Sequence, residues 1–214
     1  MLIVMPHLYP ALAERCKVLE KQFDTLPSQR KTMLIDLAQK CLDQYKIQEK
    51  LDLVYICTHN SRRSHFGQIW AAIAAEFVGL ESIKSYSGGT EATAFHPNAI
   101  HALQQQGCVI EQLDKTNNPS YKVSIGPDKF EVCFSKQFDQ DGNPTTNFGA
   151  VMTCSDAEEN CPLVTGAVFR VACTYDDPKI SDDTPNEHEH YLERADQIAL
   201  ESLFLFSTLR SSIH

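Results

Sequence analysis

The sequence lacks several features that define broad classes of protein. No apolar run in its 214 residues is long enough to cross a bilayer, so we expect no membrane-spanning segment. Acidic residues outnumber basic ones, 28 to 19, and the net charge of −9 argues against general nucleic-acid binding and against an anionic membrane surface. Internal repeats and low-complexity tracts are absent as well. An anionic ligand would therefore need a local positive site.

The spacing of the cysteines argues against a structural zinc site. The chain has eight of them but no pair spaced C-x2-C, so the spacing does not indicate a structural zinc site. The apolar first residues lack a basic segment and are broken by Pro6 and Pro10, which is not the pattern of a signal peptide. We therefore expect a reducing, cytoplasmic location, in which cysteines are core residues, ligands or catalysts rather than bridges. Neither a metal nor a cofactor is expected.

Hydrophobic periodicity divides the chain near residue 50. Residues 1–50 are predicted to form a helical extension, with one helix over about 11–23 and another from Ser28 as N-cap to about Tyr45. From Leu51 strands and helices alternate, which predicts an α/β domain over residues 51–214: an open parallel sheet of about four strands with helices on both faces. The predicted strands of this sheet are LDLVYIC, SIKSYS, FGAVMTC and AVFRVACT. Residues 113–147 are rich in turn residues, and we interpret them as an inserted hairpin with loops, in which DKFEVCFS is a further strand.

The segment YICTHNSRRS places a cysteine between a buried strand and a helix. Cys57 ends the strand, Arg63 follows six residues later, and a helix begins at about Ser64. Loop N–H groups and the helix N-terminus offer positive potential to an oxyanion, and Arg63 offers a fork to two of its oxygens. The same field favours the Cys57 thiolate and makes it a nucleophile. The alternative is a buried structural cysteine before a polar loop. The predicted oxyanion-binding residues are Thr58, His59, Asn60, Ser61, Arg62, Arg63 and Ser64.

At these residues the chain resembles a known family. ICTHNSRRS looks like the phosphate loop of low-molecular-weight protein tyrosine phosphatases and of the arsenate reductases that share their fold. YSGGTEATAFHPNAIHAL, VMTCSDAEENCP and TYDDP resemble later segments of that family. The resemblance implies an arsenate or phosphate oxyanion as substrate. It also implies that Asp177 is the general acid, with Asp176 as a neighbour able to share or replace that role.

Cys154 and Cys161 distinguish the two branches of this family. A phosphatase needs no such pair, whereas a reductase draws two electrons from thiols. Similarity to thioredoxin-coupled arsenate reductases implies that Cys57 attacks arsenate, that Cys154 and then Cys161 resolve the adduct through disulfides, and that thioredoxin is the electron donor. One alternative is a phosphatase that hydrolyses phosphotyrosine or small phosphoesters through a phosphocysteine at Cys57. A non-enzymatic anion sensor or scaffold is the other.

The sequence also departs from the reductase pattern. His59 stands where the family usually has glycine, and Arg62 where it often has another cysteine. Gln68 aligns with a glutamate that many reductases use to bind potassium, and the missing carboxylate argues against that ion. The aromatic pair that phosphatases commonly place after the acid is absent from DDPKISDDTP, which disfavours recognition of a phosphotyrosine ring.

Overall fold

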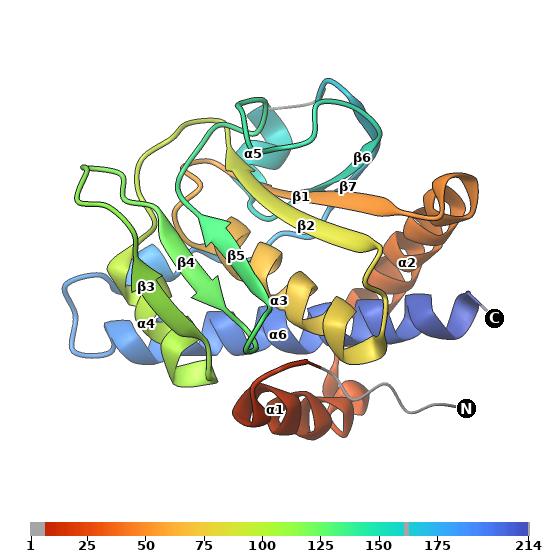
Figure 1. Ribbon diagram of the computed structural model, residues 1–214, viewed down its shortest axis with the longest axis horizontal. Coiled ribbons are helices and arrows are strands. Elements are labelled where there is room, and N and C mark those ends of the chain that lie inside the picture. The colour runs from red at the N-terminus through yellow and green to blue at the C-terminus, as the bar shows by residue number, and fades with distance from the viewer. Residues whose placement is uncertain (1–6, 161–162, 214) are drawn as a thin grey trace.

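A parallel four-stranded sheet forms the centre of the molecule. The computed structural model describes residues 7–160 and 163–213 (Figure 1). The strands are β1 (Leu51–Cys57), β2 (Ile83–Gly89), β6 (Phe148–Met152) and β7 (Ala167–Ala172). Their order in the sheet is β2-β1-β6-β7, and all neighbours run parallel. β1 and β6 are buried along almost their whole length, as central strands covered on both faces must be. The predicted α/β fold is confirmed.

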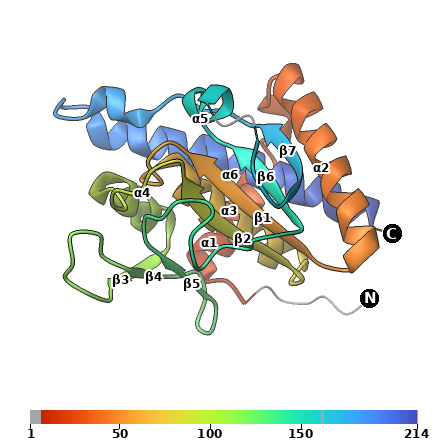
Figure 2. The same ribbon diagram turned by 90° about the horizontal axis from the view of Figure 1, so that it is seen from above.

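Helices cover both faces of this sheet. α3 (Arg63–Val78) and α6 (Glu187–Ser212) lie on one face and pack against each other, while the short α5 (Ser155–Asn160) lies on the other (Figures 1 and 2). α4 (Pro97–Gln106) packs on α6; it begins with a proline and ends before Gly107, whose φ of 113° is readily adopted only by glycine. α6 has 26 residues and carries a buried apolar face.

Residues 7–50 contain two helices and a short 3-10 turn that pack on α6. They are α1 (Pro10–Glu20), η1 (Phe23–Thr25) and α2 (Ser28–Gln48). The apolar stripe of α2, including Leu34 and Cys41, is buried in the same core as the sheet. The prediction of Ser28 as N-cap is wrong: extended Pro27 takes that place, and Ser28 is the first helical residue. The domain boundary at residue 50 stays a prediction. No helix in the described ranges is both long and apolar enough for a membrane span.

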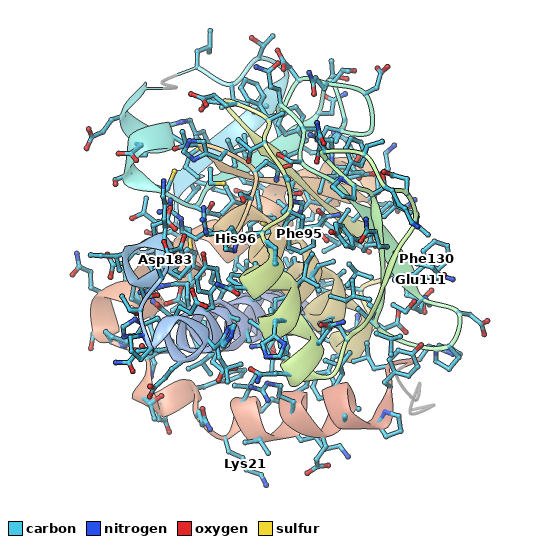
Figure 3. The ribbon with its side chains drawn as sticks, turned by 90° about the vertical axis from the view of Figure 1, so that its left-hand side faces the viewer. Lys21, Phe95, His96, Glu111, Phe130 and Asp183 are labelled. Atoms are coloured by element: carbon cyan, nitrogen blue, oxygen red, sulfur yellow. The ribbon has the colours of Figure 1, made fainter. Side chains whose placement is uncertain are left out.

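A second, antiparallel sheet lies beside the first. Its strands are β3 (Val109–Gln112), β4 (Tyr121–Ser124) and β5 (Phe130–Cys133), in that order. β4 and β5 form a hairpin within the predicted insert, although β3 and β4 themselves were not predicted. Figure 3 shows Phe130 and Glu111 on this sheet, across the view from Asp183. Residues after β5 contact the end of β2, because Gly89 N donates to Lys136 O at 2.9 Å. The second sheet is thereby attached to the edge where the parallel strands end.

Candidate active site

Cys57 is the last residue of β1, at the carboxyl edge of the parallel sheet. Its side chain is buried, and its Sγ lies 3.1 Å from Ser64 Oγ. Asn60 Nδ2 donates to the same Ser64 oxygen at 2.8 Å, so the Ser64 hydroxyl hydrogen is available to Sγ. A hydrogen bond in that direction stabilises negative charge on the sulfur. The arrangement suits a nucleophile.

Neighbouring segments take up the carbonyl groups of the cradle loop, residues 57–64. The bonds are Thr90 N to Cys57 O (3.1 Å), Glu91 N to Thr58 O (2.8 Å), Ser135 Oγ to His59 O (3.0 Å) and His96 N to Ser61 O (3.0 Å). Asn60 adopts a left-handed φ of 44°, which asparagine tolerates, and its Oδ1 accepts a bond from Lys136 N at 2.8 Å. With its carbonyls held from outside, the loop leaves N–H groups for an anion at its centre.

Arg63 is the first residue of α3, and the structure brings it to Asp177. Arg63 Nη2 lies 2.5 Å from Asp177 Oδ2, and Nη1 donates to Tyr175 O at 2.8 Å. Its Nε is buried and has no hydrogen-bond partner among the described residues. Asp176, in contrast, has a side chain that is 95% exposed and contacts Arg194 at 3.4 Å. The geometry therefore favours Asp177 over Asp176 as the acid that acts with Arg63.

Cys154 follows β6 and lies against the cradle loop. Its Sγ is 3.4 Å from Thr58 Oγ1, the residue after Cys57, and it accepts a bond from Ala157 N at 3.4 Å. The residue is completely buried. Two predicted thiols thus stand at the ends of adjacent strands β1 and β6. Cys161, the third thiol of the predicted set, lies outside the described residues.

The side chains of Arg62 and His59 have partners outside the cradle. Arg62 Nε donates to Tyr191 OH at 2.5 Å and its Nη2 pairs with Asp182 at 3.0 Å. This guanidinium joins the loop to α6 and is not available to an anion at Arg63. His59 is partly exposed and lies 3.9 Å from Glu91. The two departures from the family pattern therefore point away from Cys57.

Two buried basic residues behind the loop were not predicted. His65 is completely buried, stacks on Phe95 with ring centroids 3.9 Å apart, and places Nδ1 3.2 Å from Ser87 Oγ. Burial and the charge of Lys136 lower the pKa of His65 to about 3, so its imidazole is neutral at pH 7. Lys136 is 3% exposed, and burial lowers its pKa as well. Neither residue has a local sequence signal, since the segments that bury them are distant in the chain.

The described residues offer no ready metal site. Across 7–160 and 163–213, no three His, Cys, Asp or Glu side chains are clustered so that they could hold an ion. Gln68, at the position of the family's potassium-binding glutamate, has its Oε1 3.8 Å from Cys133 Sγ.

Comparison with known proteins assigns the chain to a family, although no family model matches it. An arsenate reductase of Bacillus subtilis (strain 168) is 29% identical over 143 residues, which span 66% of this chain and 84% of that protein. Arsenate reductase 2 of Staphylococcus epidermidis is 30% identical over 131 residues, 61% of this chain and 80% of that protein. The solution structure of a low-molecular-weight protein tyrosine phosphatase from Bacillus subtilis has a TM-score of 0.50 at 14% identity, covering 77% of this chain and 100% of that one. The fold is that of low-molecular-weight protein tyrosine phosphatases, and the chain belongs to the arsenate reductase family.

Proposed function

We propose that this protein is an enzyme that reduces arsenate to arsenite through Cys57, Cys154 and Cys161. The observation that carries the proposal is the second thiol, since Cys154 Sγ lies 3.4 Å from Thr58 Oγ1 beside the nucleophile. Hydrolysis of a phosphoester needs one cysteine, whereas reduction of As(V) to As(III) needs two electrons, which two thiols supply. The similarity to curated arsenate reductases supports the same conclusion.

In the first step, the Cys57 thiolate attacks the arsenic of an arsenate held by loop N–H groups and Arg63. An S–As bond forms and an As–O bond breaks, and the departing oxygen takes a proton from Asp177 and leaves as water. Without an anion, Arg63 and Asp177 are paired with each other. An arriving oxyanion takes over the guanidinium, which frees the Asp177 carboxyl to act as the acid.

In the second step, Cys154 attacks the sulfur of the Cys57–arsenic adduct. A disulfide forms, the S–As bond breaks, and its electron pair stays on arsenic, which leaves as arsenite. Cys161 then attacks Cys154, and Cys57 departs as a thiolate ready for the next cycle. Thioredoxin reduces the resulting Cys154–Cys161 disulfide in the reducing cytoplasm, which we propose as the location. The catalytic part spans residues 51–214 in this proposal, with residues 1–50 as an extension and 113–147 as an insert.

Disulfide mapping tests the relay. The reduced protein is incubated with arsenate, free thiols are alkylated, and disulfides are identified by mass spectrometry while arsenite is measured. We expect a Cys154–Cys161 bridge that forms only with arsenate. Cys57→Ser should abolish all activity, and Cys161→Ser should permit one turnover but no cycling with thioredoxin. Cys108→Ser, a buried cysteine outside the site, is the control and should retain full activity. Free thiols throughout after arsenate treatment would reject the relay.

A low-molecular-weight phosphatase is the second candidate. Arsenate and phosphate are both tetrahedral oxyanions, so the pairing of Cys57, Arg63 and Asp177 fits either substrate. A phosphatase would form a phosphocysteine at Cys57 that water then hydrolyses, and the other two thiols would be inert or regulatory. Rapid turnover of p-nitrophenyl phosphate, with no disulfide after arsenate treatment, would favour this candidate.

A further inference from the structure

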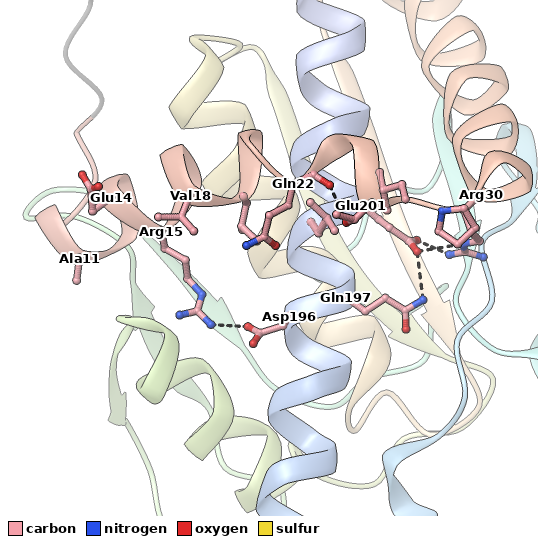
Figure 4. A pocket seen from close by; sticks show the side chains of 14 residues that line it. Ala11, Glu14, Arg15, Val18, Gln22, Arg30, Asp196, Gln197 and Glu201 are labelled. Carbon is pink, nitrogen blue, oxygen red and sulfur yellow. Dashed lines mark hydrogen bonds and ion pairs between the residues drawn. The ribbon is translucent and has the colours of Figure 1, made fainter.

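Arg30 on α2 joins the N-terminal helices to the segment that follows β7. Its Nε donates to Glu201 Oε1 at 3.0 Å, and its Nη2 pairs with the other carboxylate oxygen. Nη1 donates to Thr174 O at 3.2 Å, Nη2 lies 3.5 Å from Cys173 Sγ, and the guanidinium carbon is 4.9 Å from the Tyr175 ring centroid. Arg30 and Glu201 line a pocket of about 800 Å³ between α1, α2 and α6. Figure 4 shows the two side chains facing each other there. One side chain therefore contacts three consecutive residues.

The partner of Arg30 is itself rigidly held. The Glu201 side chain is 1% exposed, and it also accepts bonds from Tyr175 OH at 2.9 Å and from Gln197 Nε2 at 3.1 Å. Loss of Arg30 would leave this buried carboxylate with neutral donors only and no opposite charge beside it, which is unfavourable. The position of the guanidinium is therefore fixed by α6 on one side and by residues 173–175 on the other.

The acid segment, residues 173–177, carries this constraint to the cradle. Tyr175 O accepts a bond from Arg63 Nη1 at 2.8 Å, and Asp177 Oδ2 lies 2.5 Å from Arg63 Nη2. Both partners of the Arg63 guanidinium thus belong to the segment that Arg30 fixes. A continuous series of contacts runs from Arg30 through Thr174 and Tyr175 to Arg63.

We propose that Arg30 is a positioning residue for the general acid: by fixing residues 173–175 it sets the place of Asp177 relative to Arg63. The inference rests on the proposed function, since it takes Asp177 as the acid. It gives α2, which lies outside the cradle loop, a consequence for catalysis. A displacement of a catalytic group by about 1 Å can cost on the order of 100-fold in rate.

The matched comparison is Arg30→Lys against Arg15→Lys. Lysine keeps the positive charge but has no planar fork, so it cannot hold Glu201 and Thr174 O together. Arg15 on α1 is the control, because it also pairs with a carboxylate of α6, that of Asp196 (Figure 4). Both of these side chains are partly exposed. We expect Arg30→Lys to slow arsenate-dependent disulfide formation in a single turnover by about tenfold, and Arg15→Lys to leave the rate unchanged.

A double-variant comparison separates positioning from general damage. If Arg30 acts through Asp177, adding Arg30→Lys to Asp177→Asn should cost no further rate, because the acid is already absent. Multiplying losses in the double variant would overturn the proposal. Thermal melting of each variant shows whether it is folded. Should Arg30→Lys not fold, Glu201→Gln keeps the shape of the partner, weakens its hold on Arg30 and should give the same pattern.

Hydrogen exchange tests the proposal without any activity. In Arg30→Lys, amides in peptides covering residues 173–178 should exchange faster than in the wild type, while Arg15→Lys should match the wild type. Unchanged exchange there in folded Arg30→Lys would refute the positioning role. If the wild-type protein forms no disulfide with arsenate, the proposed function is rejected instead. Even then, the exchange rates of residues 173–178 would show whether Arg30 holds this segment in place.

Discussion

Asp177→Asn should separate anion binding from chemistry. In the structure the carboxylate competes with an incoming anion, because it lies 2.5 Å from Arg63 Nη2. The Asp177 side chain is 32% exposed, so solvent screens the pair and we assign it about 1 kcal/mol. Removing that competition should tighten phosphate binding by about fivefold. The same change removes the proton donor, which should slow arsenate-dependent disulfide formation by roughly 100-fold to 10,000-fold.

Two measurements test this split. Calorimetry with inorganic phosphate reports affinity, because the protein thiols do not reduce phosphate, and quenched single-turnover reactions with arsenate report the rate. Asp176→Asn is the control, since its side chain is 95% exposed and contacts Arg194 rather than Arg63; both quantities should stay at their wild-type values. Weaker phosphate binding together with a normal rate in Asp177→Asn would refute the reasoning about this pair.

Two further predictions concern the loop and the residue behind it. Ser64→Ala should slow alkylation of Cys57 by iodoacetamide at about pH 7 by about tenfold, since a hydrogen bond to a charged group contributes about 1.5 kcal/mol. Ser61→Ala, whose hydroxyl donates to Ala94 O at 2.7 Å, should not change that rate, and equal slowing in both would contradict the assignment. Burial lowers the pKa of His65 from 6.5 to about 3, so between these values the unfolded chain binds a proton that the folded chain does not. The free energy of unfolding should therefore decrease by about 1.4 kcal/mol for each unit by which the pH is lowered through this range, and His65→Asn should flatten that slope in urea unfolding between about pH 4.5 and 7.

The fold and the cradle loop were predictable because their signals are local. A buried strand, a polar loop and a helix start follow one another within residues 51–64, and hydrophobic periodicity locates the other parallel strands. The second sheet was harder to predict, since β3 and β4 have four residues each. Val123 on β4 is the only buried residue of these two strands. Short strands with little buried surface carry almost no alternation of apolar and polar residues. Their pairing depends on the neighbouring strand rather than on their own sequence.

The α6 partners of Arg62 and Arg30 were not predictable, because this helix lies far along the chain from both arginines. The sequence of α6 indicates only an amphipathic closing helix, yet its buried face also carries Tyr191 and Glu201. Tyr191 holds Arg62 across 129 positions, and Glu201 holds Arg30 across 171. A polar group on a buried helix face costs free energy unless it is paired, so each such residue requires a partner that only the tertiary structure can supply. Since these partners lie in the cradle loop and in α2, α6 ties the nucleophile loop and the N-terminal helices to a common support. The positions of the proposed reacting groups therefore depend on a helix that contributes none of them.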